Sequence, residues 1–146
     1  MNSALSMAGM ALRAGRLEVG EDPAGDACRE RRCRLLLTAS DAGESTLRRS
    51  ARLAQEGQCL ILALPFTREE LGAALGRGSC AIAAVTDLGL ARAIADRLAA
   101  QDPERYGEAA QRLRLKAERA AQRRERSGKQ PRDGRNRAPV KYRNKP

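Results

Sequence analysis

Residues 34–65 read RLLLTASDAGESTLRRSARLAQEGQCLILALP, and this stretch decides the fold class. It begins with three consecutive leucines at 35–37, a continuous apolar run of the kind expected for a strand covered on both faces. A helical pattern follows at 45–56 and ends at Gly57, and a second apolar run at 59–64 stops at Pro65. The helix residues expected to face inward are Leu47, Ala51 and Ala54. A strand, a helix and a second buried strand in this order predict a layered α/β domain.

The same alternation runs through the first hundred residues. Helices are expected at 3–13, 21–30, 67–75 and 88–100, with further strands at 16–19 and 80–86. Thr67 and Glu70 have the spacing of a capping box, in which each side chain satisfies an amide of the first helical turn. Together with 34–39 and 59–64, these segments predict four strands and a fold in which helices and strands alternate.

Charge divides the chain more sharply than hydropathy does. Of the 146 residues, 1–100 contain 13 arginines against 12 acidic residues, whereas 101–146 hold 15 of the 28 basic residues against 6 of the 18 acidic ones. Large aliphatic residues are almost missing after 101, so no core is expected there. A basic helix is predicted at 101–126, with a narrow stripe that comprises Ala109, Leu113, Ala117 and Ala121. Glycine and proline predict that 127–146 is disordered when free.

A net charge of +10 concentrated in one third of the chain favours a polyanionic partner. Nucleic acid is the first candidate, and an anionic membrane surface is disfavoured because the basic segment lacks the apolar face of an interfacial helix. Base stacking on an aromatic platform is also disfavoured, because Phe66, Tyr106 and Tyr142 are the chain's aromatic residues. Neither a membrane-spanning run nor a signal peptide is apparent, so a cytoplasmic location is expected.

The sequence offers little for catalysis. It contains no histidine, no nucleophile elbow and no phosphate-loop motif, so neither an enzyme nor a cofactor or small-molecule substrate is expected. The cysteines are expected to be reduced, and their spacing fits no zinc pattern, so no metal site is predicted. Cys59 and Cys80 are expected in the core. Asp41 and Asp87 each follow a strand, where ligands often bind, but helix capping is the favoured interpretation.

Three loops can converge at one end of the predicted sheet. Residues 20–22 open a helix, residues 41–46 follow the second strand, and residues 76–79 precede the fourth. Free amides at a helix start can meet a phosphate, although each of these loops taken singly is a weak signal.

Five ordered segments resemble the kink-turn RNA-binding ribosomal-protein superfamily that includes L-seven-A-e and L-thirty-e, and especially its short bacterial cytoplasmic members. They are 5–16 (LSMAGMALRAGR), 19–22 (VGED), 35–42 (LLLTASDA), 70–76 (ELGAALG) and 81–87 (AIAAVTD). The resemblance spans about residues 4–98. It implies a three-layer α/β/α sandwich around a mixed four-stranded sheet, to which the basic helix and the disordered tail are added.

The resemblance also implies an RNA-binding site. In kink-turn binders, the helix that begins at the position of Gly20 carries a Gly-x-Asn-Glu motif that reads tandem sheared G·A pairs. Here Asp22 replaces the Asn and Pro23 replaces the Glu, while Asp26 stands where a basic residue is usual. Leu47 matches an apolar contact to an extruded base. Arg68 matches a backbone contact, and residues 77–82 match the loop and strand edge that lie against RNA.

The sequence therefore predicts a non-enzymatic protein that binds structured, kink-turn-like or ribosomal RNA in ribosome assembly or translation. Ribosomal or translation-factor proteins are further expected partners. The predicted RNA-binding residues are Arg16, Gly20, Glu21, Asp22, Leu47, Arg68, Gly76, Arg77, Gly78, Ser79, Ile82, Arg123, Arg124 and Arg126. In the alternative, Pro23 and Asp26 mark a domain that has lost kink-turn recognition and binds a protein through the same loops. A third possibility, the recognition part of an RNA-modifying enzyme, lacks the length for a catalytic domain.

Overall fold

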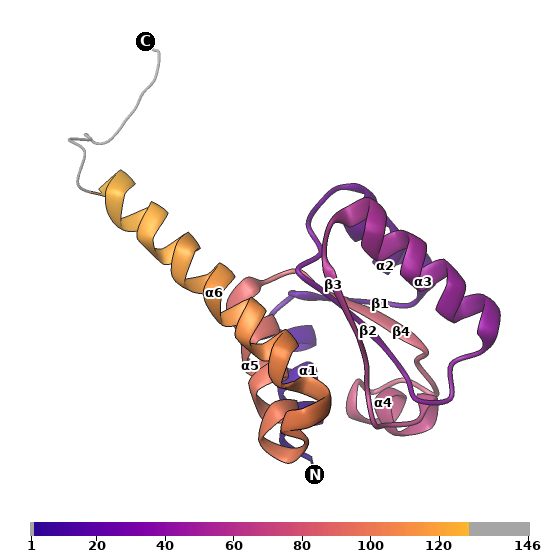
Figure 1. The fold of residues 1–146 in the computed structure, drawn as a ribbon. Helices are drawn as coiled ribbons and strands as arrows, with labels where there is room; N and C mark the ends of the chain where they lie inside the picture. The colour runs from indigo at the N-terminus through magenta and orange to yellow at the C-terminus, as the bar shows by residue number, and fades with distance from the viewer. Residues whose placement is uncertain (1, 129–146) are drawn as a thin grey trace. The chain divides into compact units, whose positions relative to one another are not determined.

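Helices and strands alternate along the chain as far as residue 101, as the sequence predicts (Figure 1). The computed structural model describes residues 2–128. Its elements are α1 (Ser3–Arg13), β1 (Leu17–Val19), α2 (Glu21–Arg29), β2 (Leu35–Thr38), α3 (Glu44–Gly57), β3 (Leu60–Ala63), α4 (Arg68–Ala74), β4 (Ile82–Val85), α5 (Leu88–Gln101) and α6 (Pro103–Gly128). The capping box at the start of α4 is present, with both the Thr67 and the Glu70 hydrogen bonds formed.

The four strands form one mixed sheet in the order β1-β4-β2-β3. β2 and β3 are parallel, with Leu36 opposite Ile61, whereas β4 is antiparallel to both β1 and β2. β2 and β4 are therefore the central strands, and every residue of both is buried. This agrees with the continuous apolar runs that identified them.

Helices cover both faces of the sheet and give three layers (Figure 1). On one face, Leu35 and Leu37 of β2 pack in a core with residues of α1, α4 and α5. On the other face, Leu36 packs with residues of α2 and α3 in a second core. Alternate side chains of one strand point to opposite faces, so the leucine run serves both cores. The α/β/α sandwich with a mixed four-stranded sheet is confirmed.

β3 differs from its prediction as a buried strand, because it lies at the edge of the sheet. Its burial alternates, with Leu60 and Leu62 half-buried and Ile61 38% exposed. Cys59, which precedes it, is likewise half-buried, whereas Cys80 is buried as expected. An apolar run does not distinguish a central strand from an edge strand, because hydropathy carries no information about strand order.

The buried face of α3 is rotated relative to the prediction. Ser50, Leu53, Ala54 and Gly57 are buried, whereas Leu47 and Ala51 are exposed. The Ser50 hydroxyl donates a hydrogen bond of 2.7 Å to the Thr46 carbonyl, so this polar side chain is buried with a partner. Leu53 and Ala54 pack with residues of α2 in the second core, and the exposed Leu47 and Ala51 lie away from this contact.

The core continues past the predicted boundary at residue 100. Tyr106, Ala110 and Leu113 of α6 are buried in the same core as α1 and α5. The Tyr106 hydroxyl donates a 2.7 Å hydrogen bond to the Ala63 carbonyl of β3. Residues after 101 build no core of their own but extend that of the preceding helices, so the first compact unit ends at Arg114 rather than near residue 100.

The second compact unit begins at Leu115 with the remainder of α6. Its side chains between 115 and 126 are exposed except for the half-buried Ala117 and Ala120. The predicted disordered tail at 127–146 falls largely outside the described residues, but its first two residues are helical. In the part of the chain that the structure describes, no helix is both long and apolar enough to span a membrane.

Candidate functional site

The three loops that the sequence predicts to converge lie at one end of the sheet. The Gly20 amide donates to the Ile82 carbonyl, and the Ala39 amide donates to the Ala81 carbonyl, at 3.0 and 2.9 Å. The Ser40 amide donates to the Phe66 carbonyl at 2.7 Å. The first two bonds tie the 20–22 and 40–43 loops to residues 82 and 81 at the start of β4, which the 76–79 loop precedes. We call these three loops the rim. The rim is a set of exposed turns on a rigid sheet, an arrangement that commonly carries binding sites.

The α4–β4 turn of the rim is held close to the helix that precedes it. Gly76 has a φ of +71°, which a left-handed turn at the end of a helix requires and glycine adopts without strain. The Arg77 amide then donates to the Gly72 carbonyl at 2.7 Å. A Cβ on Gly72 would lie 2.6 Å from Ser79 Cα, so only glycine permits this approach. The turn presents exposed Arg77, whose side chain has no ion-pair partner in the described residues.

Asp41 joins the 40–43 loop of the rim to the start of α4. Its carboxylate accepts a 2.7 Å hydrogen bond from the Arg68 amide, the first amide of α4, and lies 3.6 Å from Arg68 Nε. Asp87 caps α5 by accepting from the Leu90 amide at 2.9 Å. The capping interpretation is thus confirmed for Asp87, which is the N-cap of α5. Asp41 does not cap the helix that follows it, because the N-cap of α3 is Gly43, and it binds instead the first amide of α4. Arg68 remains 52% exposed, but part of its charge is offset by Asp41.

The start of α2 is poorly suited to phosphate. The amides of Gly20 and Ala24 are already used within the fold, and Pro23 has none. Only the amides of Glu21 and Asp22 remain, and both residues carry carboxylates in the first turn. Negative side chains at this end already complement the helix dipole and repel an anion. The expected phosphate contact at residues 20–22 is therefore unfavourable, whereas a hydrogen-bond donor fits.

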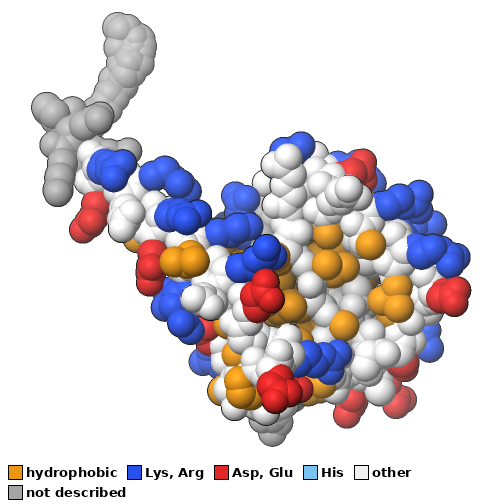
Figure 2. Space-filling view, viewed as in Figure 1, with side chains coloured by type: hydrophobic (Ala, Val, Ile, Leu, Met, Phe, Trp, Pro, Cys, Tyr) orange, Lys and Arg blue, Asp and Glu red, His pale blue; other side chains and the backbone are white. Residues whose placement is uncertain are grey.

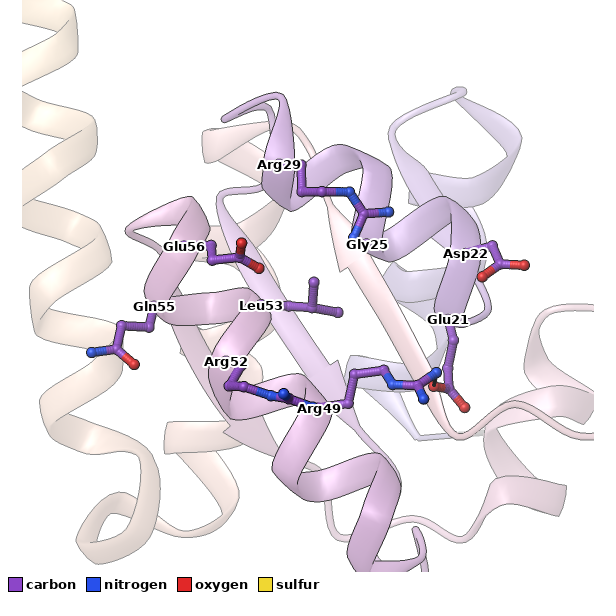
Figure 3. Close-up of a pocket in the computed structure, with 9 residues that line it drawn as sticks. All are labelled: Glu21, Asp22, Gly25, Arg29, Arg49, Arg52, Leu53, Gln55 and Glu56. Carbon is purple, nitrogen blue, oxygen red and sulfur yellow. Dashed lines mark hydrogen bonds and ion pairs between the residues drawn. The ribbon is translucent and has the colours of Figure 1, made fainter.

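A groove of about 620 Å³ lies beside the rim, between α2 and α3 (Figure 3). Leu53 and Gly25 are among the residues that line it. Arg49 from α3 reaches across to Glu21 of α2, with 2.7 Å between Nη1 and Oε1. Arg52 also lines the groove and makes no ion pair within the described residues. The remaining lining residues are Asp22, Arg29, Gln55 and Glu56.

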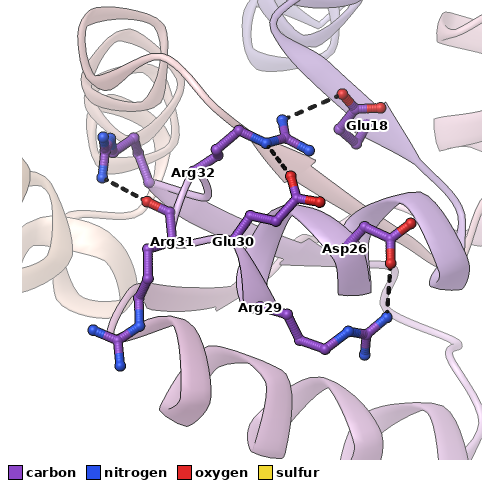
Figure 4. A network of polar contacts seen from close by, with 7 residues as sticks. Glu18, Asp26, Arg29, Glu30, Arg31 and Arg32 are labelled. Carbon is purple, nitrogen blue, oxygen red and sulfur yellow. Dashed lines mark hydrogen bonds and ion pairs between the residues drawn. The ribbon is translucent and has the colours of Figure 1, made fainter.

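Several other arginines have structural partners (Figure 4). Arg32 lies 2.7 Å from Glu30 and 3.6 Å from Glu18 of β1, so it ties the end of α2 to the sheet. The hydrogen bond with Glu30 raises the pKa of Arg32. Arg29 pairs with Asp26 at 2.9 Å. These pairs explain why a domain with 13 arginines in its first hundred residues has little uncompensated charge.

The structure separates the predicted RNA-binding residues into three groups. Gly20, Glu21, Asp22, Arg68, Gly76, Arg77, Gly78 and Ser79 lie at or beside the rim. Leu47 is 41% exposed on the second turn of α3. Arg16 lies at the opposite end of the sheet from the rim, where its carbonyl accepts from the Thr86 amide. It therefore does not join the other residues. Arg123, Arg124 and Arg126 are exposed in the second unit.

Ile82 cannot serve as a side-chain contact. It is 1% exposed and packs in the core beneath α2 and α3, and its carbonyl already accepts from Gly20. Ile82 is buried because it is the first residue of β4 and does not belong to the loop before that strand. Ile82 therefore positions the rim from below.

Sequence spacing missed a cluster of three thiols. The sulfur atoms of Cys28, Cys33 and Cys59 all lie within 4.8 Å of one another, and the last two are 3.5 Å apart. Burial, and then the Cys59 thiol, raise the pKa of Cys28 to about 11. The hydrogen bond with Cys59, followed by burial, raises the pKa of Cys33. A separation of 26 residues between Cys33 and Cys59 conceals this proximity from any motif search.

Comparisons with known proteins support the fold. No family model matches the sequence, and no curated protein matches it. A solved structure described as a protein with unknown function from Bacillus halodurans is similar to this chain, with 28% sequence identity and a TM-score of 0.62. The similarity covers 66% of this chain and 97% of that one. It supports the α/β architecture, and the description of that protein assigns it no activity.

Proposed function

We propose that the protein binds structured RNA in ribosome assembly or translation in the cytoplasm. The rim recognises the shape of the RNA, and the basic surface of α6 supplies much of the affinity. The observation that carries this proposal is the convergence of the 20–22 and 76–79 loops at one end of the sheet. The resemblance described above associates these loops with RNA. The proposal does not depend on an aromatic platform or on a phosphate bound at the α2 helix start.

The charge of α6 supports an electrostatic contribution to affinity. Between 115 and 126 the helix carries five basic residues and two acidic ones, and blue side chains mark it in Figure 2. None of the five makes an ion pair within the described residues. Unpaired, exposed cations are available to phosphates, and each phosphate neutralised releases condensed counterions. The basic residues are Lys116, Arg119, Arg123, Arg124 and Arg126.

The rim supports recognition of a different kind. Asp22 is exposed and bears an acceptor that a guanine amino group can use. Arg77 is exposed on the turn held by Gly72, where it can contact the RNA backbone. Leu47 offers an apolar surface on α3 for an unstacked base. These three side chains have the chemistry for a base edge, a phosphate and a base face.

The proposal is tested by salt titrations of full-length protein binding to a kink-turn RNA. Replacement of Arg123, Arg124 and Arg126 by Gln is expected to weaken binding and to reduce the slope of log K against log salt by about 2 to 3. The matched control replaces Arg16, Arg31 and Arg34 by Gln in the same way. These residues lie at or near the end of the sheet opposite to the rim. An equal loss in both triple variants would contradict the assignment to α6.

Preference for shape is tested separately with duplex DNA of equal length as the competitor. The full chain is expected to prefer folded RNA, because general attraction to phosphate does not distinguish the two. Equal affinity for both would overturn the RNA proposal. A cellular partner retained after ribonuclease treatment, together with no affinity for folded RNA, would instead identify a protein-binding module.

A further inference from the structure

We propose that Cys28, Cys33 and Cys59 form a binding site for a thiophilic d¹⁰ metal ion, of the class that includes Zn²⁺ and Cu⁺. The site is independent of the rim, because the three cysteines lie at the other end of α2 and at the starts of β2 and β3. Their chemistry suits such an ion, since thiolates select soft and borderline metals over Mg²⁺ or Ca²⁺.

The distances already approach those of a metal–thiolate centre. A metal–sulfur bond of about 2.3 Å places neighbouring sulfurs of a tetrahedral site about 3.8 Å apart. The three sulfurs lie within 4.8 Å of one another, and one pair is at 3.5 Å. Rotamer adjustments of a few tenths of an ångström to about one ångström would therefore suffice for coordination.

The backbone holds these cysteines together from three separate segments. Arg31 has a φ of 60° and turns the chain after α2, so that the Cys33 amide donates to the Ala27 carbonyl at 3.2 Å. Gln58 has a φ of 52° and turns the chain after α3, and the Cys59 amide then donates to the Ala54 carbonyl at 3.0 Å. Two left-handed residues that are not glycine stand close to cysteines of the cluster. Such a conformation costs energy and persists where surrounding structure supports it.

The helices that carry the cluster are also packed closely. A Cβ on Gly57 would lie 3.0 Å from the Cys28 carbonyl oxygen and 3.2 Å from Cys28 Cα. Gly57 therefore lets the end of α3 approach the last turn of α2. This approach brings Cys59, two residues further on, to the Cys28 thiol.

The three cysteines differ in how deeply they are buried. Cys28 and Cys33 are buried, whereas Cys59 is half-buried, so the Cys59 side of the cluster is the one nearer to solvent. Arg29 adjoins Cys28, but its guanidinium already pairs with Asp26 at 2.9 Å. It therefore offsets little of the single negative charge that three thiolates leave around a divalent ion. A disulfide between two of the thiols would not account for the third, which lies within 4.8 Å of both.

Protons limit the affinity of this site. A thiol ordinarily titrates above neutral pH and must be a thiolate to bind a metal ion, so metal binding displaces protons. Below the thiol pKa values, affinity is therefore expected to rise with pH, with up to about three protons released per ion.

The test uses the full chain, reduced with a phosphine, stripped with a chelator and titrated with Cd²⁺. We expect one Cd²⁺ per chain and a thiolate-to-metal charge-transfer band, with the same result for the matched control C80S. In C59S and C59A the band should lose about a third of its intensity and the affinity should fall at least about tenfold. Circular dichroism verifies that each variant is folded.

Three results would overturn the proposal. One is the absence of a charge-transfer band in the folded wild-type chain. Another is equal Cd²⁺ binding by the wild type and both Cys59 variants. The third combines two observations. The metal-free chain forms a Cys33–Cys59 disulfide on exposure to air, detected as a loss of two thiols, and it binds no metal after that disulfide has been reduced. None of these depends on whether the protein binds RNA.

Discussion

Two acidic residues on α2 make opposite contributions to the proposed interface. Asp22 is exposed at the start of the helix and offers an acceptor to a base edge. Asp26 lies one turn further along and pairs with Arg29 at 2.9 Å, so it removes a cation from the surface near the groove. The same charge is thus useful at one position and unfavourable at the other.

Substitution of these aspartates is expected to change RNA affinity in opposite directions. Asp22→Ala should weaken binding to RNA with tandem G·A pairs by about 1 to 3 kcal/mol, because the guanine donor loses its partner. Asp26→Ala should strengthen binding by about 1 kcal/mol or less, because repulsion falls and Arg29 is released. Fluorescence anisotropy at fixed salt measures both. A change of the same sign in the two variants would contradict these roles.

Tyr106 links α6 to the sheet edge and is expected to influence stability at high pH. Burial raises its pKa above the ordinary value of 10.0, so the unfolded chain loses the phenolic proton before the folded chain does. Stability therefore falls as pH rises above about 10. Buried Cys28, Cys33 and Cys80 act in the same direction from their ordinary value of 9.0 upward.

Urea denaturation between about pH 9 and pH 11 separates these contributions. Tyr106→Phe should cost about 1 kcal/mol at neutral pH through loss of the hydrogen bond to Ala63. The variant should then lose less stability than the wild type as pH rises through the tyrosine range. Parallel pH curves for the two proteins would show that Tyr106 does not contribute.

At the scale of elements, glycines set how closely segments approach. Gly57 allows α2 and α3 to meet, and Gly9 brings α1 against α4, where a Cβ would lie 3.1 Å from the Ala74 carbonyl oxygen. Gly72 has the tightest approach, because it faces the backbone of the rim turn. Backbone atoms cannot rotate away as a flexible side chain can, so these contacts fix the positions of whole segments.

Gly72→Ala is expected to displace the 76–79 turn and to destabilise the protein by about 1 to 3 kcal/mol. The matched control is Gly107→Ala, which lies outside the rim and whose Cβ would meet no atom within 4 Å. Chemical denaturation measures stability, and RNA titration reports the position of Arg77. An effect of Gly72→Ala no larger than that of Gly107→Ala on both measurements would contradict this packing.

At the scale of the whole molecule, the compact unit and the charged segment share one helix. The first part of α6 contributes Tyr106, Ala110 and Leu113 to the core, and Arg114 pairs with Asp96 of α5 at 3.3 Å. From Leu115 onward, the described side chains are almost all exposed and mainly basic. The division of labour between packing and charge therefore falls within α6 rather than before it.

Truncation locates this division. A chain that ends after Arg114 is expected to retain the stability of the full chain, whereas one that ends after Asp102 exposes the surface that Tyr106 and Leu113 cover. The second truncation should cost roughly 3 to 6 kcal/mol, from two large buried side chains. Thermal and urea unfolding measure the difference. Equal stability of both truncated chains would place the boundary near residue 100 after all.

The sequence by itself determined the order and type of the elements, because apolar periodicity and helix caps are local properties. The leucine run at 35–37 identified a strand buried on both faces, and the split in charge identified the basic segment. The spacing of polar loops after strands also indicated that residues 20–22 and 76–79 could meet. Each of these inferences uses neighbours along the chain.

Only the tertiary structure decided which of these neighbours face inward and which distant residues touch. The edge position of β3, the rotation of α3 and the burial of Tyr106 and Ile82 depend on strand order and on packing between helices. The three thiols of Cys28, Cys33 and Cys59 meet because two helices end side by side. Such contacts join residues that are far apart in the sequence. Local sequence patterns give no information about how close these residues lie in space.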